Sequence, residues 1–251
     1  MLAKLVLSLK SGSDKKISMS MSSAFQGVLM EVVGSKTAAW LHENQINPYS
    51  QYIQYKDNNI WWNILTATKE AFEKVIKPFM EDDVSVINVK YSDMKFEIIG
   101  KKMEQISMKS FMKQQYFTDY GHFFTINFLS PTSFKSDGNY KNYPTIHWIF
   151  RSLMKKHDAI CSDNEVYDDE VLALLEEKTF ITQYNLRSTI FYLEGVKIPA
   201  FLGKITILVK SSQSLVNLVN YLLMLGEYTG VGIKSSIGMG AISVEHKERG
   251  E

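Results

Sequence analysis

The order of hydrophobic patterns along the chain constrains the fold more than any other feature. Leucines at every second position of residues 5–9 have the period of two that predicts a strand. Apolar residues then recur at helical spacing over residues 24–33 and, after Gly34, over residues 36–43. The segment continues with two strands, a helix capped by Thr68 and further strand-like stretches, predicted over residues 52–54, 60–67, 84–89 and 95–99. This half of the chain therefore runs strand, helix, two strands, helix, strand.

The same order recurs after a polar segment, residues 113–119, which we interpret as a linker. The second copy is predicted to contain a strand, a helix, a hairpin that turns at Glu194-Gly195, a helix and a last strand, over residues 123–129, 146–154, 181–193 with 197–209, 212–226 and 239–244. Ser212 is expected to begin the last of these helices and Gly226 to end it. The acidic stretch of residues 158–177 is expected to be a solvated insertion in this copy.

Two β-α-β-β-α-β units in tandem describe an α+β fold made of two ferredoxin-like, or RRM-like, domains. We expect the first domain at residues 1–115 and the second at residues 120–251. With 251 residues and 45% hydrophobic content, the chain is long enough to build two hydrophobic cores.

Composition narrows the classes of function. Lys and Arg total 28 against 27 acidic residues, so nucleic-acid binding would have to depend on a local patch. Cys161 stands alone, which excludes an intramolecular disulfide and a thiolate cluster for zinc. The apolar stretch at the N-terminus is too short for a signal peptide, and no run approaches the ~20 apolar residues of a membrane span. We expect a soluble, cytoplasmic protein with no membrane partner.

A glycine-rich stretch between the last helix and the last strand is the sharpest local motif. Glycines permit positive φ and close backbone approach, so exposed N–H groups of such a loop can bind phosphate, with a lysine adding charge. The motif fits neither a P-loop nor a Rossmann turn, because it precedes a strand rather than a helix. A purely structural turn is the alternative. The candidate RNA-binding residues are Gly230, Gly232, Lys234, Ser235, Ser236, Gly238 and Gly240.

This loop, together with Phe128–Phe134 and with Pro144 before Ile149–Leu153, resembles the repeat-associated RNA-binding superfamily of CRISPR proteins. Within it, the chain is most similar to the repeat-cleaving endoribonucleases, the Cas-six family. Gln26-Gly27 opening one helix, and Ala39–Glu43 closing the next, resemble the family's segment with the catalytic histidine. The resemblance implies tandem ferredoxin-like domains, precursor and mature CRISPR repeat RNA as the partner, and no metal or other cofactor.

The resemblance also implies a reaction in which a ribose 2′-hydroxyl attacks the adjacent phosphate, leaving a cyclic phosphate and a 5′-hydroxyl. Such chemistry needs a base, an acid and positive charge, which His, Tyr and Lys can supply. His42 is the catalytic residue that the resemblance carries over. The chain departs from the family by having Met30 where some members have a tyrosine, and by lacking a lysine soon after His42. Tyr49 and Lys36 are candidate helpers by nearness alone.

Other interpretations stay open at this stage. A non-catalytic RNA-binding subunit of a CRISPR effector complex would share the fold and the loop, and a ferredoxin-like enzyme for small molecules is a third possibility. His42 could be a surface or capping residue, and His157-Asp158 is similar to a metal-binding pair of phosphohydrolases, although further ligands at suitable spacing are missing. Effector-complex subunits and a second copy of the chain are further candidate partners.

Overall fold

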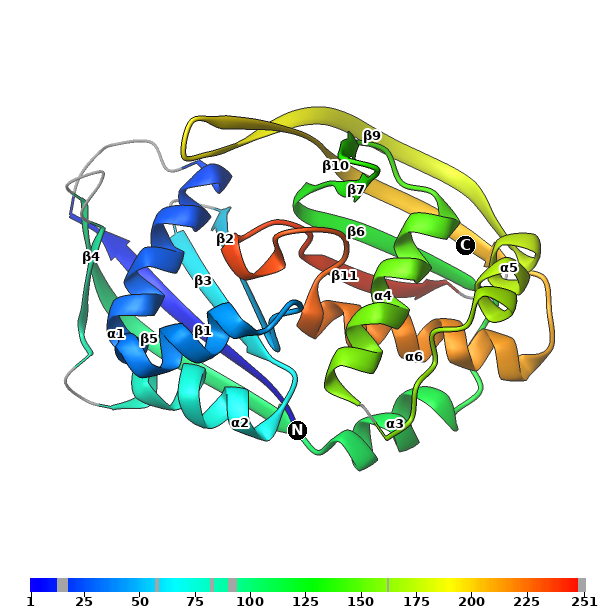
Figure 1. Ribbon diagram of the computed structural model, residues 1–251, viewed down its shortest axis with the longest axis horizontal. Coiled ribbons are helices and arrows are strands. Elements are labelled where there is room, and N and C mark those ends of the chain that lie inside the picture. Colours follow the sequence, from blue (N-terminus) through cyan, green and yellow to red (C-terminus); the bar gives the residue numbers. More distant parts are fainter. Residues whose placement is uncertain (13–17, 57–58, 82–83, 90–93, 162, 248–251) are drawn as a thin grey trace.

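The computed structural model describes residues 1–12, 18–56, 59–81, 84–89, 94–161 and 163–247. These residues form two large sheets side by side (Figure 1) and one two-stranded sheet. The first sheet has five strands in the order β2-β3-β1-β5-β4. Its elements are β1 (Leu2–Ser11), α1 (Ser22–Glu43), β2 (Tyr49–Lys56), β3 (Asn59–Thr66), α2 (Lys69–Ala71), β4 (Val86–Val89) and β5 (Met94–Ile106). Without its edge strand β4, this is the order of a ferredoxin-like sheet, as the sequence predicts.

Alternating burial along β1 explains why this strand sits at the centre of the first sheet. Leu5 and Leu7 are fully buried, and they pair across the sheet with Ile64 and Trp62 of β3. The Trp62 ring meets Phe25 of α1 edge-on, with ring centroids 5.0 Å apart. The period of two in the sequence therefore marks the face that α1 covers.

Helix α1 breaks at Gly34, as the sequence predicts. Gly34 has φ of 78° and ψ of 167°, a conformation outside the helical region that glycine adopts without steric cost. The break divides α1 into a first segment that packs on the sheet through Phe25 and Leu29, and a second segment that carries His42 in its last turn. The two segments can therefore point in different directions.

The helix predicted after Thr68 is shorter than expected. The Thr68 side chain does cap α2, accepting a hydrogen bond of 3.0 Å from the Ala71 N–H. The chain then continues as a π-helical turn, Phe72–Ile76, and a 3₁₀ turn, Lys77–Met80. Pro78 lies at the start of that 3₁₀ turn and cannot donate to an α-helical ladder, so it prevents a regular helix here.

The second sheet has four strands in the order β11-β6-β10-β9. The elements of this half are α3 (Met108–Tyr116), β6 (Phe123–Thr132), β7 (Phe134–Ser136), β8 (Asn139–Lys141), α4 (Ile146–Ile160), α5 (Asp169–Lys178), β9 (Thr179–Leu193), β10 (Val196–Val209), α6 (Gln213–Thr229) and β11 (Ile242–Lys247). Numbered within this half, β6, β9, β10 and β11 have the ferredoxin-like order 4-1-3-2. The hairpin turns at Glu194-Gly195, where both residues have positive φ, as the sequence predicts.

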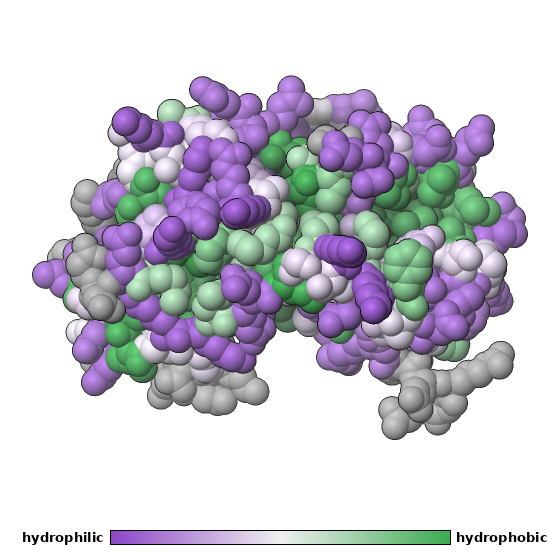
Figure 2. Space-filling model, turned by 90° about the horizontal axis from the view of Figure 1, so that it is seen from below, coloured by the Kyte–Doolittle hydropathy of each residue, from purple (hydrophilic) through white to green (hydrophobic). Residues whose placement is uncertain are grey.

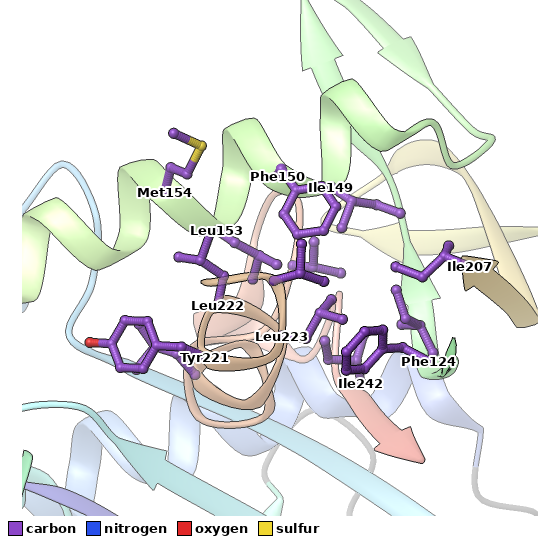
Figure 3. Close-up of a cluster of buried hydrophobic side chains, with 14 of the residues drawn as sticks. Phe124, Ile149, Phe150, Leu153, Met154, Ile207, Tyr221, Leu222, Leu223 and Ile242 are labelled. Carbon is purple, nitrogen blue, oxygen red and sulfur yellow. The ribbon is translucent and has the colours of Figure 1, made fainter. Parts of the chain in front are cut away.

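Gly226 does not end the last helix, contrary to the expectation from the sequence. Helix α6 continues to Thr229, and Gly230, with φ of 68°, follows it. A Cβ atom at Gly226 would lie 2.7 Å from Leu153 and 2.9 Å from Ile242, so this glycine serves close packing between α6, α4 and β11. Figure 3 shows the core at this point, where α4 and α6 pack together and against the strands.

Several contacts join the two halves. The Ser50 hydroxyl of β2 donates a 2.7 Å hydrogen bond to the Tyr228 carbonyl of α6. A small buried cluster combines both halves: it contains Tyr52, Leu65, Leu129, Tyr228 and Ala241. On the face seen in Figure 2, hydrophobic residues lie in the middle of the molecule and also toward its right end, with hydrophilic residues between them.

Helix α3 occupies the first part of the segment that the sequence marks as a linker, and the domain boundaries at residues 115 and 120 stay a prediction. Within the described ranges, no helix is long and apolar enough to cross a membrane.

Candidate active site

His42 lies in the last turn of α1, and its side chain is exposed. The helix ends immediately afterwards, where the Asn44 side chain donates a 2.8 Å hydrogen bond to the Trp40 carbonyl. His42 is therefore accessible to a ligand at the end of a helix.

The segment that follows His42 lines a cleft of about 580 Å³. Residues 45–47 form one wall, and the opposite wall comes from the second half of the chain, from α4 and from the glycine-rich loop. The basic residues at the cleft are Lys135, Arg151, Lys155, Lys156 and Lys234. Among the described residues that line it, none is acidic. A cleft of this charge attracts a polyanion, although the whole protein is nearly neutral.

The glycines of the loop allow it to pack tightly. A Cβ atom at Gly232 would lie 2.3 Å from the Ser133 carbonyl oxygen, and one at Gly240 would lie 1.9 Å from the Val231 carbonyl oxygen. At Gly238, where φ is 105°, a Cβ atom would lie 2.0 Å from Cβ of Ser22, the first residue of α1. The loop therefore packs both on its own half of the molecule and on the helix that carries His42.

The backbone N–H groups of the loop divide into two sets. Those of Val231, Gly232 and Gly240 donate to the Gly240 carbonyl, the Ser152 hydroxyl and the Pro131 carbonyl, at 2.7 to 3.1 Å. Within the described chain, the N–H groups of Lys234, Ser235 and Ser236 donate to no protein acceptor. All three of these residues line the cleft. Successive N–H groups of this kind bind anions such as phosphate.

Lys156, a residue that the sequence analysis did not select, fixes the start of the loop. Its Nζ atom donates to the carbonyls of Thr229 and Gly230 and to the Ser235 hydroxyl, at 2.9 to 3.0 Å. Burial lowers the pKa of Lys156 to about 7, an effect that the three acceptors oppose because they match the three hydrogens of the charged form. Its sequence neighbour Lys155 also lines the cleft.

Helical spacing is the signal that could have identified the α4 residues. Trp148, Arg151 and Lys155 recur at intervals of three and four residues, so they lie on one face of α4. In the sequence, Arg151 stands out only within the segment that resembles the Cas-six family, and the acidic residues after Lys156 are more conspicuous than the basic ones before them. The structure places α4 beside the glycine-rich loop, and all three residues line the cleft.

Tyr49 and Lys36, the candidate helpers of His42, differ in their surroundings. Tyr49 is buried, and its hydroxyl lies beside the polar side chains of Gln26 and Ser236. Burial raises the pKa of Tyr49 to about 12, which makes proton exchange with a substrate at neutral pH unfavourable. Lys36 is exposed, but six helical residues separate it from His42, a rotation of about 240° around the helix axis.

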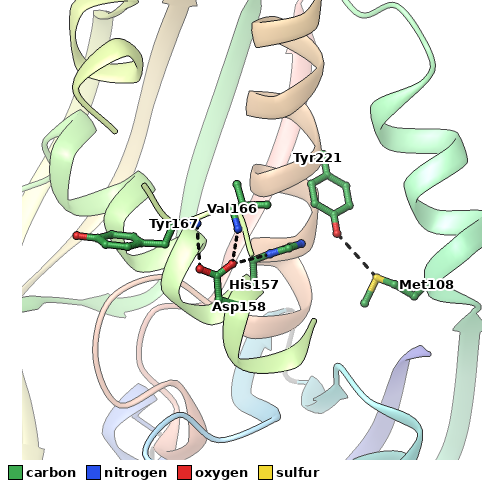
Figure 4. Close-up of polar contacts among 6 residues, drawn as sticks. All are labelled: Met108, His157, Asp158, Val166, Tyr167 and Tyr221. Carbon is green, nitrogen blue, oxygen red and sulfur yellow. Dashed lines mark hydrogen bonds and ion pairs between the residues drawn. The ribbon is translucent and has the colours of Figure 1, made fainter. Parts of the chain in front are cut away.

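His157 and Asp158 form a structural pair (Figure 4). His157 is 1% exposed, and its Nδ1 atom lies 2.9 Å from Asp158 Oδ1. The Asp158 carboxylate also accepts the N–H groups of Val166 and Tyr167 at 2.7 and 2.9 Å, so it anchors the chain that follows α4. In the part of the chain that the structure describes, no three His, Cys, Asp or Glu side chains gather closely enough to hold a metal ion.

Comparison with known proteins identifies the family. The family profile of the CRISPR-associated endoribonuclease Cas6 matches residues 126–242. A Streptococcus thermophilus protein named CRISPR-associated endoribonuclease Cas6 is 31% identical over 225 residues, which cover 89% of this chain and 91% of that protein. This chain belongs to the Cas6 family. A Mycobacterium tuberculosis Cas6 is 30% identical over 220 residues, 87% of this chain and 70% of that protein.

Solved Cas6 structures share the fold. A Cas6 product complex superimposes with a TM-score of 0.79 at 20% identity, covering 98% of this chain and all of the other. A Thermus thermophilus Cas6 superimposes with a TM-score of 0.71 at 19% identity, covering 98% of both chains. The tandem ferredoxin-like architecture expected from the sequence is thereby confirmed, and membership of the Cas6 family makes the protein an endoribonuclease.

Proposed function

We propose that this protein matures CRISPR RNA by cutting the repeat of the precursor, with His42 as the group that transfers protons at the scissile phosphate. The observation that carries the proposal is the position of His42 at the end of α1, directly before the segment that lines the basic cleft. A polyanionic RNA held in that cleft would pass close to an exposed histidine, and no acidic side chain among the described lining residues would repel it.

The reaction that fits these groups is attack of a ribose 2′-hydroxyl on the adjacent phosphorus. The 2′-hydroxyl passes its proton to solvent water while its oxygen bonds to phosphorus and closes a cyclic phosphate. The bond to the 5′-oxygen breaks, and the leaving oxygen takes a proton. His42 gives that proton, and the cations of the cleft stabilise the negative charge that accumulates on the phosphate. The reaction needs a 2′-hydroxyl, so DNA of the same sequence is bound but not cut. Tyr49 and Lys36 stay the candidate helpers proposed from the sequence, and the burial of Tyr49 supports a role in holding Ser236.

Positive charge already present in the cleft supports a metal-independent reaction. Lys and Arg side chains and backbone N–H groups can do for the phosphate what a divalent ion does in other nucleases. We expect purified protein to cut labelled repeat RNA at the same rate in EDTA as in magnesium. Activity that disappears in EDTA and returns with magnesium or manganese would contradict this part of the proposal.

The glycine-rich loop is proposed to hold the RNA backbone through its cleft-facing residues. We expect Lys234→Ala to weaken binding and to reduce the slope of log affinity against log salt by about 0.7, the value for one lost phosphate contact on a single strand. Lys197→Ala is the matched control, because Lys197 is an exposed lysine of the same half that does not line the cleft. An unchanged slope for Lys234→Ala, measured by titration at several salt concentrations, would make the loop a purely structural turn.

Cleavage of labelled repeat RNA, measured beside these titrations, separates this proposal from the non-catalytic alternative. A subunit that only binds RNA would retain the salt-dependent affinity and leave the repeat uncut. A cytoplasmic location, and effector-complex subunits or a second copy of the chain as partners, stay predictions from the sequence.

A further inference from the structure

Trp148 is an aromatic side chain in a cleft whose other prominent features are cationic. It lies near the start of α4, after the N-cap Thr145, and its ring is half-buried at the cleft wall. Within the described residues, its indole N–H donates to no protein acceptor, in contrast to the indole N–H of Trp62, which donates to Gln51 at 2.9 Å. Trp148 therefore presents both an aromatic surface and an unused donor at the cleft.

Arg151 lies beside this ring. The centre of its guanidinium is 5.7 Å from the ring centroid, within the range of a cation–π contact. An aromatic ring and a planar guanidinium are the two kinds of side-chain surface on which unpaired RNA bases stack. Lys155, one helical turn further along the same face, adds charge about 10 Å from Trp148 along the helix axis.

We propose that the Trp148 ring binds one unpaired base of the RNA, and that Arg151 moves from the ring to the phosphate of that nucleotide. Lys155 then contacts a neighbouring phosphate of the same strand. The inference rests on the proposed function and extends it, because it requires the RNA in this part of the cleft to be single-stranded. A base within a duplex is stacked on both faces and is not accessible to the ring.

Binding of short single-stranded RNA at several salt concentrations tests the proposal. Trp148→Ala should lower the affinity by about 5- to 150-fold, the range for losing one base–aromatic stack, without changing the salt slope. Trp148→Phe should keep most of the affinity, because it keeps an aromatic face. Arg151→Ala should reduce the slope by about 0.7, as expected for a phosphate contact. Equal affinities for wild type and Trp148→Ala would overturn the proposal.

A matched control and a substrate series locate the effect. Trp61 of β3 is also half-buried but does not line the cleft, so Trp61→Ala should bind as wild type does. If Trp61→Ala lost as much RNA affinity as Trp148→Ala, the lost binding would not arise at the cleft. The assignment of a base-binding role to Trp148 would then be overturned. In a series of oligonucleotides, each with one abasic site at a different position, the abasic site should weaken binding to wild type at one position only. At that position it should leave the affinity for Trp148→Ala unchanged. If no position behaves in this way, the base contact is wrong.

Cleavage of the full repeat shows whether the Trp148 site alone or the whole proposed function is wrong. If wild type cuts the repeat and Trp148→Ala binds RNA equally well, the Trp148 site alone is refuted. If wild type neither binds nor cuts the repeat, the proposed function itself fails. Circular dichroism and thermal unfolding of each variant show whether α4 is still folded, and Trp148→Phe provides a test even if Trp148→Ala is destabilised.

Discussion

Replacing His42 by alanine should slow single-turnover cleavage of repeat RNA by about 10²–10⁴-fold, the usual loss when a proton-transfer group is removed. Imidazole is the side chain for which both the neutral and the cationic form are accessible near neutral pH, so no other residue at the end of α1 can replace it. The affinity for RNA should stay almost unchanged, because His42 lies beside the cleft and not among its lining residues. The measurement is cleavage at saturating protein, with binding followed separately.

Two controls belong with this variant. His122→Ala removes another exposed histidine, one whose Nδ1 atom lies 2.8 Å from the Val209 carbonyl in the second half, and it should cut at the wild-type rate. A substrate with a 2′-deoxy residue upstream of the cut should bind wild type and resist cleavage. Wild-type cleavage by the His42→Ala protein would remove this histidine from the mechanism and direct attention to Tyr49 and Lys36.

Gly238→Ala should destabilise the protein by about 2–6 kcal/mol, the sum of about 1–3 kcal/mol for a non-glycine residue in strained backbone and about 1–3 kcal/mol for overpacking. The physical cause is the 2.0 Å separation between the new Cβ atom and Cβ of Ser22, together with φ of 105°. Urea unfolding measures the loss.

Gly138 provides the matched control for Gly238. It also has positive φ, 78°, but no atom lies within 4 Å of a Cβ atom placed there. Gly138→Ala should therefore cost only the backbone strain, about 1–2 kcal/mol. In the Gly238→Ala background, Ser22→Gly should recover part of the loss by removing the atom that clashes. Equal losses at Gly138 and Gly238, with no recovery, would show that the contact with Ser22 is not the cause.

The sequence predicts the strands and helices well because their hydrophobic periodicity reports directly on burial. Leu5 and Leu7 mark β1, Gly34 marks the break in α1, and Glu194-Gly195 marks the hairpin turn, each through a local rule. Gly226 shows the limit of such rules. Its role depends on Leu153 and Ile242, which are 73 and 16 residues away in the sequence, and a helix-ending glycine looks the same locally.

The cleft could be predicted only in part for the same reason. The glycine-rich loop is a local motif, so the sequence alone indicates it. Lys156 and Trp148 reach the cleft only because α4 packs beside that loop, which the sequence does not show. Nothing in a run of two lysines indicates that one is buried against three acceptors while the other faces the cleft. Gln26 and Ser236, which lie beside the Tyr49 hydroxyl, are also distant from Tyr49 in the sequence. The burial of Tyr49 therefore could not be inferred from its nearness to His42 in the sequence.

The buried cluster that joins the two halves also determines when the molecule can be completed during synthesis. Tyr52 and Leu65 leave the ribosome early, but their partners Tyr228 and Ala241 are made more than 160 residues later. Strand β11, which begins at Ile242 and forms an edge of the second sheet, is also made at this late point. While the second half is being translated, the first half must keep an apolar surface open to solvent, and such surfaces are prone to aggregate. Truncation before Ala241 should therefore harm yield more than the number of residues removed suggests.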